Sequence, residues 1–339
     1  MHNIFSRLKQ SQQDAVRAFA HVAGYLATAI IPSRLDRSVI NGLTAMLFRL
    51  RPHAVAQRAT RIAEVLGKDP AGPEVLDIGR DYYRLVIEGA WGRFRGTHKR
   101  AWQPVIRLEG LDEVHKALER GKGVILWRWS FCSSPIVKTA LWREQMPLVH
   151  LSWINHGAWS NSWVGRRVLR PVYRRSEDCY LRERVIIPDT GSHTYIKTLI
   201  ERLAENSVVS IVGDHPNVQN VTARLFDGTA PYALGAPSLA WKTGATLLTT
   251  HAVSESACDY RVLIDKPIEV DRTLPRKEFA RQAVEEFAQR LQVAIANHPA
   301  SWTNWGAFLD GEEPFWRPGT EADSSQPDES PQAEQAGTD

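Results

Sequence analysis

The sequence is poor in cysteine. Its 339 residues include only Cys132, Cys179 and Cys258. No two of them stand at the spacing of a metal-binding pair, and they do not form a disulfide framework. We therefore expect free thiols, a reducing compartment and no metal site.

The sequence also lacks a hydrophobic run long enough to cross a membrane. The most apolar early stretch, residues 18–31, is interrupted by His21 and stops at Pro32, short of the roughly 18–20 residues that span a bilayer. The N-terminus does not have the pattern of a signal peptide. The stretch is flanked by five basic residues: Arg7, Lys9, Arg17, Arg34 and Arg37. Two interpretations stay open, a helix lying in a membrane interface and a helix packed on the protein's own core.

Basic residues are absent after Arg317. Six acidic residues follow it, so the formal charge of +4 for the whole chain becomes +10 for residues 1–318. This balance suits anionic partners such as a phospholipid surface or the phosphate groups of an acyl donor. The aromatic residues lie among apolar strands rather than in a basic stripe, and we expect no nucleic-acid partner.

From residue 105 onward, segments with the pattern of strands alternate with segments that have the pattern of helices. Before them, one helix is predicted to end at residues 67–70 and another to begin near Glu74. The predicted strands cover residues 105–108, 124–129, 148–153, 207–212, 245–253 and 260–268. The predicted helices between them cover residues 111–119, 136–142, 193–205, 237–242 and 277–296. This alternation indicates an α/β fold with a mixed, mostly parallel sheet flanked by helices, and with N-terminal helices.

Three regions are expected along the chain. Residues 1–53 form an N-terminal helical segment that could contact a membrane, and residues 54–318 form the α/β domain. Residues 319–339 are rich in Ser, Pro, Gln and acidic residues, a composition typical of disorder.

Four stretches, taken in this order and spacing, carry a resemblance to a known family. They are LEGLDEVHKALERGKGVIL (108–126), NSVVSIVGDHP (206–216), RLFDGTAPYALGAPSLAWKTGATLL (224–248) and ANHPASWTNW (296–305). Together they resemble the bacterial lipid A (lauroyl/myristoyl) acyltransferases of the lysophospholipid acyltransferase superfamily, over roughly residues 55–310.

The resemblance implies both an activity and a location. It implies transfer of an acyl chain from an acyl-carrier-protein or coenzyme A thioester to a hydroxyl of a lipid or glycolipid, with no cofactor. It also implies a peripheral protein at the cytoplasmic face of the bacterial inner membrane.

One part of the family pattern is missing. In the family the first buried strand delivers a histidine, and an acidic residue five positions later completes the pair that deprotonates the acceptor hydroxyl. Those two positions hold Ser130 and Pro135, and none of the 11 histidines has Asp or Glu five positions later. An unactivated serine hydroxyl holds its proton too tightly to serve as the base.

An active enzyme would therefore need another base or another mechanism. His215 follows Asp214 at the end of a predicted strand, where α/β folds build their sites. Cys132 could instead accept the acyl group from the thioester, with Arg128 as a cation that stabilises its thiolate. The other candidate bases are His150, His156 and His193.

A catalytically inactive relative is the remaining alternative. Such a protein would bind acyl chains or partner enzymes through an inherited groove, whose mouth Trp127 and Trp129 could fill. An enzyme would instead gather Asp214, His215 and the loop 130–134 around one open pocket.

The candidate site follows from these positions. The candidate catalytic residues are Ser130, Cys132, Asp214 and His215. The candidate substrate-binding residues are Arg128, Arg166, Arg167, Phe226 and Gly228. The arginines suit the phosphate groups of donor or acceptor because the guanidinium is planar and always charged, and the resemblance places Phe226 and Gly228 in the pocket wall.

Overall fold

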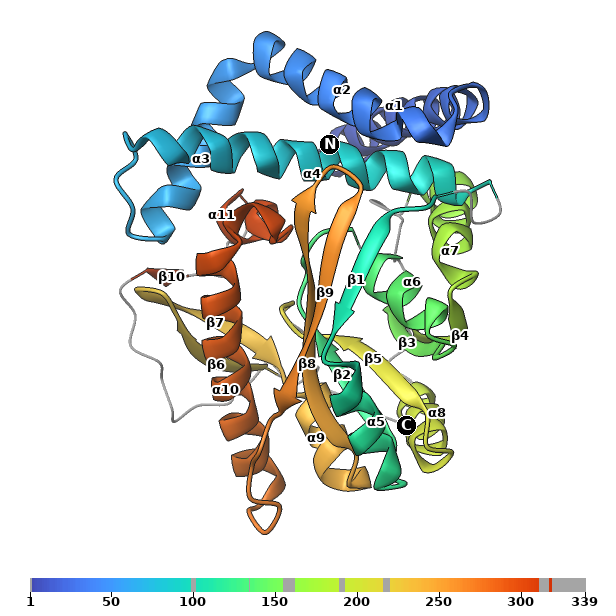
Figure 1. Ribbon diagram of the computed structural model, residues 1–339, viewed down its shortest axis with the longest axis vertical. Coiled ribbons are helices and arrows are strands. Elements are labelled where there is room, and N and C mark those ends of the chain that lie inside the picture. Colours follow the sequence, from blue (N-terminus) through green and yellow to red (C-terminus); the bar gives the residue numbers. More distant parts are fainter. Residues whose placement is uncertain are drawn as a thin grey trace, which may run out of the picture.

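The computed structural model describes residues 2–98, 102–133, 135–154, 162–188, 193–215, 220–310 and 317–318. Its centre is a seven-stranded sheet in the order β1-β9-β8-β2-β5-β3-β4 (Figure 1). The strands are β1 (Val105–Glu109), β2 (Val124–Arg128), β3 (Leu148–Trp153), β4 (Leu181–Ile187), β5 (Val208–Val212), β8 (Thr246–Ser256) and β9 (Asp259–Pro267).

The sheet is mixed and mostly parallel, as the sequence predicts. Strands β8, β2, β5, β3 and β4 pair in parallel. Strand β9 turns back antiparallel to β8, and β1 lies parallel to β9 at the edge. A second, antiparallel sheet contains β6 (Asn220–Leu225), β7 (Gly228–Ala233) and β10 (Arg317–Pro318).

Helices lie on both sides of the sheet. Strand β2 has no polar face because it is covered on both sides, the usual condition of a parallel strand. Its odd-numbered side chains, such as Trp127, pack into the larger core and its even-numbered apolar ones, such as Leu126, into a second core. The helices after β1 are α5 (Leu111–Glu119), α6 (Pro135–Arg143), α7 (Arg170–Asp178), α8 (Thr194–Ala204), α9 (Gly235–Thr243), α10 (Arg276–Asn297) and α11 (Trp305–Asp310).

The N-terminal helices form a layer across one end of the sheet, at the top of Figure 1. They are α1 (His2–Ile30), α2 (Asp36–Leu50), α3 (Pro52–Val65) and α4 (Pro73–Gly96). The expected boundary at residue 53 falls in the first turn of α3. Buried Arg95 of α4 ties this layer together, because it contacts the Asp36 carboxylate and the backbone carbonyls of Thr28 and Ile31.

Within the described ranges, no helix has both the length and the apolar character that crossing a bilayer requires. The expected acidic tail, residues 319–339, lies outside the described residues.

Candidate active site

The candidate site forms where two neighbouring parallel strands end. Strands β2 and β5 pair along their whole lengths, from Val124 with Val208 to Arg128 with Val212. The N–H of Gly213 then donates to the Arg128 carbonyl over 2.9 Å. Ser130 and Asp214, each two positions past the end of its strand, therefore meet at the carboxyl end of the sheet, where α/β folds place their sites.

Gly213 is required by the close approach of the core beneath it. A Cβ atom at this position would lie 1.9 Å from Trp127 Nε1 and 2.7 Å from Phe287 Cζ, distances at which any side chain would force the backbone away. The Trp127 and Phe287 rings are themselves stacked, with centroids 3.9 Å apart. Gly213 thus lets the chain bring Asp214 directly over the core to Ser130.

Ser130 is held between a carboxylate and an imidazole. Its backbone N–H donates to Asp214 Oδ2 over 2.8 Å, and its Oγ donates to Asp214 Oδ1 over 2.8 Å. The same Oγ lies 3.2 Å from His215 Nε2. Asp214 is only 3 % exposed, Ser130 is half-buried and His215 is exposed.

The number of available hydrogens determines which group donates in each hydrogen bond between Asp214, Ser130 and His215. A serine hydroxyl has one hydrogen, and here Asp214 accepts it. Ser130 Oγ can then only accept from His215, so the hydrogen-bond network assigns the imidazole hydrogen to Nε2. The unprotonated lone pair of the exposed His215 ring is then at Nδ1, which is what a general base needs.

The segment after α10 also contacts the site, through hydrogen bonds to Asp214 and Ser130. Trp302 Nε1 donates to Asp214 Oδ2 over 2.8 Å, and Asn304 Nδ2 donates to the Asp214 carbonyl over 2.7 Å. The N–H and Oγ1 of Thr303 both donate to the Ser130 carbonyl over 2.7 Å. The motif ANHPASWTNW is therefore part of the site, a role that the sequence did not reveal.

Cys132 is buried next to the site. Its backbone adopts a left-handed conformation with φ of 51°, and its N–H donates to the Ser301 carbonyl. Burial raises the pKa of the Cys132 thiol, and the nearby Glu88 carboxylate adds to the effect. A thiol that resists ionisation is a poor nucleophile, so this environment does not favour the covalent cysteine route.

Arg128 is also buried, beneath the site at the end of β2. Burial lowers the pKa of the Arg128 guanidinium, whereas the negative charges of Glu177 and Asp214 act in the opposite direction. A side chain that is 2 % exposed does not face solvent. Its position suits electrostatic support of Asp214 rather than contact with a ligand in solvent.

The other predicted binding residues lie on separate elements. Arg166 and Arg167 are exposed on the π-helical turn Gly165–Leu169 that precedes α7. The N–H of Phe226 donates to Gln292 Oε1, and Gly228 begins β7. Among the described residues, no hydrogen bond or ion pair joins these four to Ser130, Asp214 or His215.

The remaining candidate bases have other surroundings. His150 is buried on β3, where desolvation and the cations of Lys138 and Arg128 hold its pKa well below the usual range. His193 is exposed at the start of α8, with its ring 6.4 Å from that of Tyr195. His156 lies outside the described residues. Among the candidate bases that the structure describes, His215 is the one bonded to Ser130.

His251, for which the sequence pattern indicates no role, makes the stability of the protein sensitive to acid. It is buried on β8, its ring centroid lies 4.8 Å from that of Trp129, and burial lowers its pKa from 6.5 to about 3. Because the folded pKa is depressed, the stability gained by burying neutral imidazole is present above pH 6.5 and is lost as the pH falls toward 3. We expect wild type to lose about 2 kcal/mol of unfolding free energy relative to His251→Leu between pH 7.5 and pH 5.

Denaturant unfolding at the two pH values measures this difference. His115→Leu, at an exposed position on α5, is the control. Equal losses in wild type and His251→Leu would contradict the assignment.

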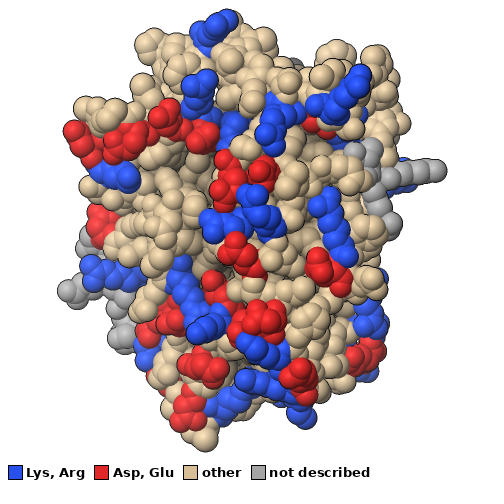
Figure 2. All heavy atoms as spheres, viewed as in Figure 1, with Lys and Arg blue, Asp and Glu red and all other residues tan. Residues whose placement is uncertain are grey.

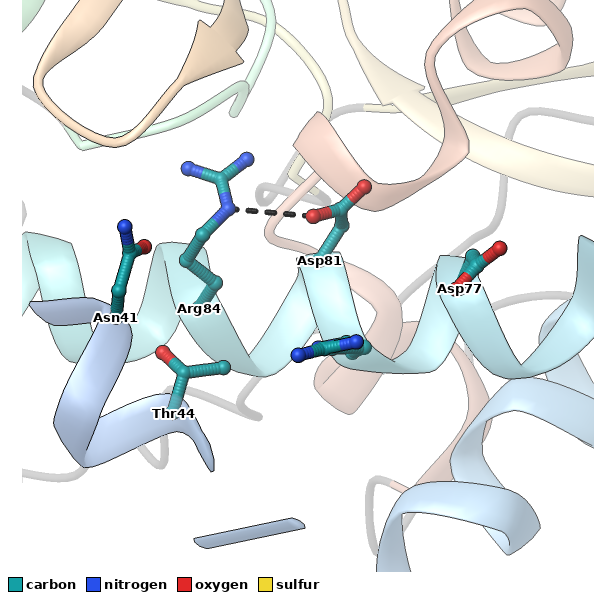
Figure 3. Close-up of a pocket in the computed structure, with 6 residues that line it drawn as sticks. Asn41, Thr44, Asp77, Asp81 and Arg84 are labelled. Carbon is teal, nitrogen blue, oxygen red and sulfur yellow. Dashed lines mark hydrogen bonds and ion pairs between the residues drawn. The ribbon is translucent and has the colours of Figure 1, made fainter. Parts of the chain in front are cut away.

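Two hollows in the surface lie away from Ser130. One of about 550 Å³ lies between α2 and α4 and is lined by Asn41, Thr44, Asp77, Arg80, Asp81 and Arg84 (Figure 3). The other, of about 510 Å³, is lined by Arg170, Pro171, Arg174, Arg175, Asp178 and Cys179 of α7 and the residue after it. The second is basic and continues the segment that carries Arg166 and Arg167.

Among the described residues, no group of three or more His, Cys, Asp and Glu side chains is arranged to hold a metal ion.

Comparison with known proteins gives one match and one negative result. The family model for bacterial lipid A biosynthesis acyltransferases matches residues 5–305. No curated protein matches the chain. The family match ends at Trp305 and so includes every residue that contacts Asp214 above.

Proposed function

The chain belongs to the bacterial lipid A biosynthesis acyltransferase family, and from this membership we propose that it transfers an acyl chain from an acyl-carrier-protein or coenzyme A thioester to a hydroxyl of a lipid or glycolipid. The observation that carries the proposal is the position of Ser130 Oγ between Asp214 Oδ1 and His215 Nε2. Histidine and acid are absent from their usual places in the family motif. In this chain His215 and Asp214, both just after β5 and linked through the Ser130 hydroxyl, take over the roles of the histidine and the acid.

The proposed reaction uses His215 as the base. His215 Nδ1 takes the proton of the acceptor hydroxyl as its oxygen attacks the thioester carbonyl carbon. The resulting imidazolium, which donates from Nε2 to Ser130, is stabilised by the negative charge of Asp214 through the serine hydroxyl. The C–S bond then breaks, the thiolate takes the proton from His215, and an ester and a free thiol leave the site.

The phosphate-bearing part of a donor or acceptor is assigned to the basic segment before and along α7. Arg166 and Arg167 are exposed there, and the adjacent 510 Å³ hollow has Arg170, Arg174 and Arg175 in its lining. Several guanidinium groups on one surface favour phosphate, because each can donate two parallel hydrogen bonds.

An assay of acyl transfer tests the function. Purified protein is mixed with radiolabelled acyl-carrier-protein or coenzyme A thioesters and a bacterial membrane lipid extract. We expect label to appear in lipid in step with loss of the thioester. Label that stays on the thioester with every donor, while acyl chains still bind, would contradict the proposal and favour a catalytically inactive acyl-binding protein.

In the inactive alternative, Trp127 and Trp129 would fill the mouth of the groove. Trp127 and Trp129 are fully buried, and both rings pack against Phe287. They therefore belong to the core beneath the site and do not fill its mouth.

We further propose that the N-terminal helices attach the protein peripherally to an anionic membrane. Helix α1 presents apolar side chains to solvent, including Phe19 at 76 % and Ile30 at 82 % exposure. Further exposed apolar residues are Val16, Val22 and Leu26 on α1 and Met46 and Leu50 on α2. Basic side chains are visible at the top of Figure 2, and the exposed charged residues in and just before α2, Arg34, Arg37 and Arg49, are all basic. Exposed apolar residues beside basic ones are typical of helices that lie in a membrane interface.

The double variant Phe19→Glu/Ile30→Glu tests this attachment. Burial of each side chain in the interface contributes about 1.5–3 kcal/mol, so we expect binding to phosphatidylglycerol vesicles to weaken by about 100-fold or more. Co-sedimentation measures it, with Val293→Glu, an exposed position of α10, as the matched control. Equal binding by both variants would exclude α1 as the attachment surface.

A further inference from the structure

A single segment after α10, residues 301–304, holds both Ser130 and Asp214 in place. It pairs with the chain around Ser130 as a short antiparallel bridge between Phe131 and Trp302. Cys132 N–H donates to the Ser301 carbonyl over 2.7 Å, and Thr303 N–H donates to the Ser130 carbonyl over 2.7 Å. The loop that carries the Ser130 hydroxyl is thus bonded to this segment on both sides of Phe131.

The same segment reaches the carboxylate of Asp214. Trp302 Nε1 donates to Oδ2 over 2.8 Å, the oxygen that also accepts from the Ser130 N–H. With Oδ2 occupied by two donors, Oδ1 is the oxygen left to accept from Ser130 Oγ. Together with the Ser130 N–H, the indole N–H therefore fixes the orientation in which the Asp214 carboxylate faces the serine hydroxyl.

The Trp302 ring is itself held rigidly. It is 1 % exposed, and its centroid lies 4.8 Å from that of Trp305 and 5.0 Å from that of Phe308, both in edge-to-face geometry. An indole packed in this way cannot rotate its N–H away from Asp214 without disrupting the cluster. Rigid support of this kind is what a preorganised site requires, because the reacting groups must already be in place when substrate binds.

We propose that Trp302 is a positioning residue of the site: through its indole N–H it orients the Asp214 carboxylate toward Ser130, and so aligns the chain of hydrogen bonds that ends at His215. The expected effect on kcat rests on the proposed acyl transfer. The orientation of Asp214 rests only on its hydrogen bond with Trp302. Trp302 touches no reacting atom, so its effect reaches the reaction only through Asp214 and Ser130.

Trp302→Phe and Trp305→Phe form a matched pair for the test. Both tryptophans are fully buried in one aromatic cluster, and each donates one hydrogen bond from Nε1, Trp302 to Asp214 and Trp305 to the Pro299 carbonyl, each over 2.8 Å. Phenylalanine keeps most of the ring packing and removes the N–H. We expect Trp302→Phe to lower kcat by about 10- to 100-fold with little change in KM, because misplacing a catalytic group acts on the reaction step. Trp305→Phe is expected to change kcat by less than about threefold. An equal loss of kcat in the two variants would overturn the proposal, because it would show that Trp302 contributes only packing.

A second readout does not depend on activity. In full-length protein labelled with 15N at tryptophan, the two substitutions identify the indole signals of Trp302 and Trp305. We expect Asp214→Asn to shift the Trp302 signal and speed its exchange with solvent, and to leave the Trp305 signal in place. A Trp302 signal unchanged by Asp214→Asn would refute the contact even if acyl transfer is observed. If the Trp302 signal shifts as expected but the protein transfers no acyl chain, the contact between Trp302 and Asp214 stands and only the proposed reaction is rejected.

Discussion

Replacing His215 by alanine is expected to lower the single-turnover rate of acyl transfer by about 10²- to 10⁴-fold, the usual contribution of a general base. The imidazole is exposed, and its Nε2 contacts Ser130 Oγ. Its loss should remove the proton acceptor and leave the sheet unchanged. Rapid mixing with labelled thioester and acid quenching measures the rate, and the midpoint of denaturant unfolding checks that the fold is retained.

His115→Ala is the control for this prediction. His115 is exposed on α5, which leads into the start of β2, at the opposite end of that strand from Ser130. We expect this variant to transfer acyl chains at the wild-type rate. A His215→Ala protein that does the same would remove His215 from the mechanism.

Replacing Asp214 by alanine is expected to damage both activity and stability. Three donors lose their acceptor: the Ser130 N–H, the Ser130 hydroxyl and the Trp302 indole N–H. Buried Arg128 also loses one of the negative charges that act on it. Because an unsatisfied buried group costs about 1–3 kcal/mol and neighbouring losses are not additive, we expect the free energy of unfolding to fall by about 2–4 kcal/mol. Acyl transfer should fall at least as far as in His215→Ala, since the carboxylate both orients Ser130 and stabilises the imidazolium.

Denaturant unfolding of Asp214→Ala beside Asp227→Ala tests the stability part. Asp227 is exposed in the turn between β6 and β7, so its loss should change the unfolding free energy by less than about 0.5 kcal/mol. An Asp214→Ala protein as stable as wild type would mean that the three hydrogen bonds contribute little to folding.

Much of the fold could be predicted from local patterns in the sequence. The run Val124–Leu126 predicts a buried strand because a parallel strand covered on both faces needs continuous apolar residues, and the structure confirms it as β2. The break at residues 67–70 and the apolar face after Glu74 likewise predict the helices that the structure confirms as α3 and α4.

The pairing of strands could not be predicted in the same way. Strand β4 lies at the edge of the sheet and has a mixed pattern of burial, so its sequence carries little strand signal. The antiparallel turn of β9 onto β8 depends on the short connection Ala257–Cys258, which contains no glycine and no strong hairpin signal.

The candidate site was predictable in its parts and not in its assembly. The sequence placed Ser130 and Asp214 at the ends of strands. Their contact depends on β2 and β5 being neighbours, although β3 and β4 lie between them in the chain. Trp302 was visible as a motif, but nothing local indicates that its N–H reaches a carboxylate 88 positions away. Such long-range contacts are set by topology rather than by the pattern of any one segment.

The most direct test of the account is chemical rescue of His215→Ala by imidazole in an acid-quenched single turnover that follows label on donor, protein and lipid. An exposed position can admit free imidazole, which would then take the acceptor proton in place of the missing side chain. We predict that imidazole restores transfer to lipid in this variant, has no effect on Asp214→Ala, and leaves no label on the protein. Label bound covalently at Ser130 or Cys132 of the wild type, or transfer in His215→Ala that is already as fast as wild type without imidazole, would contradict His215 as the base.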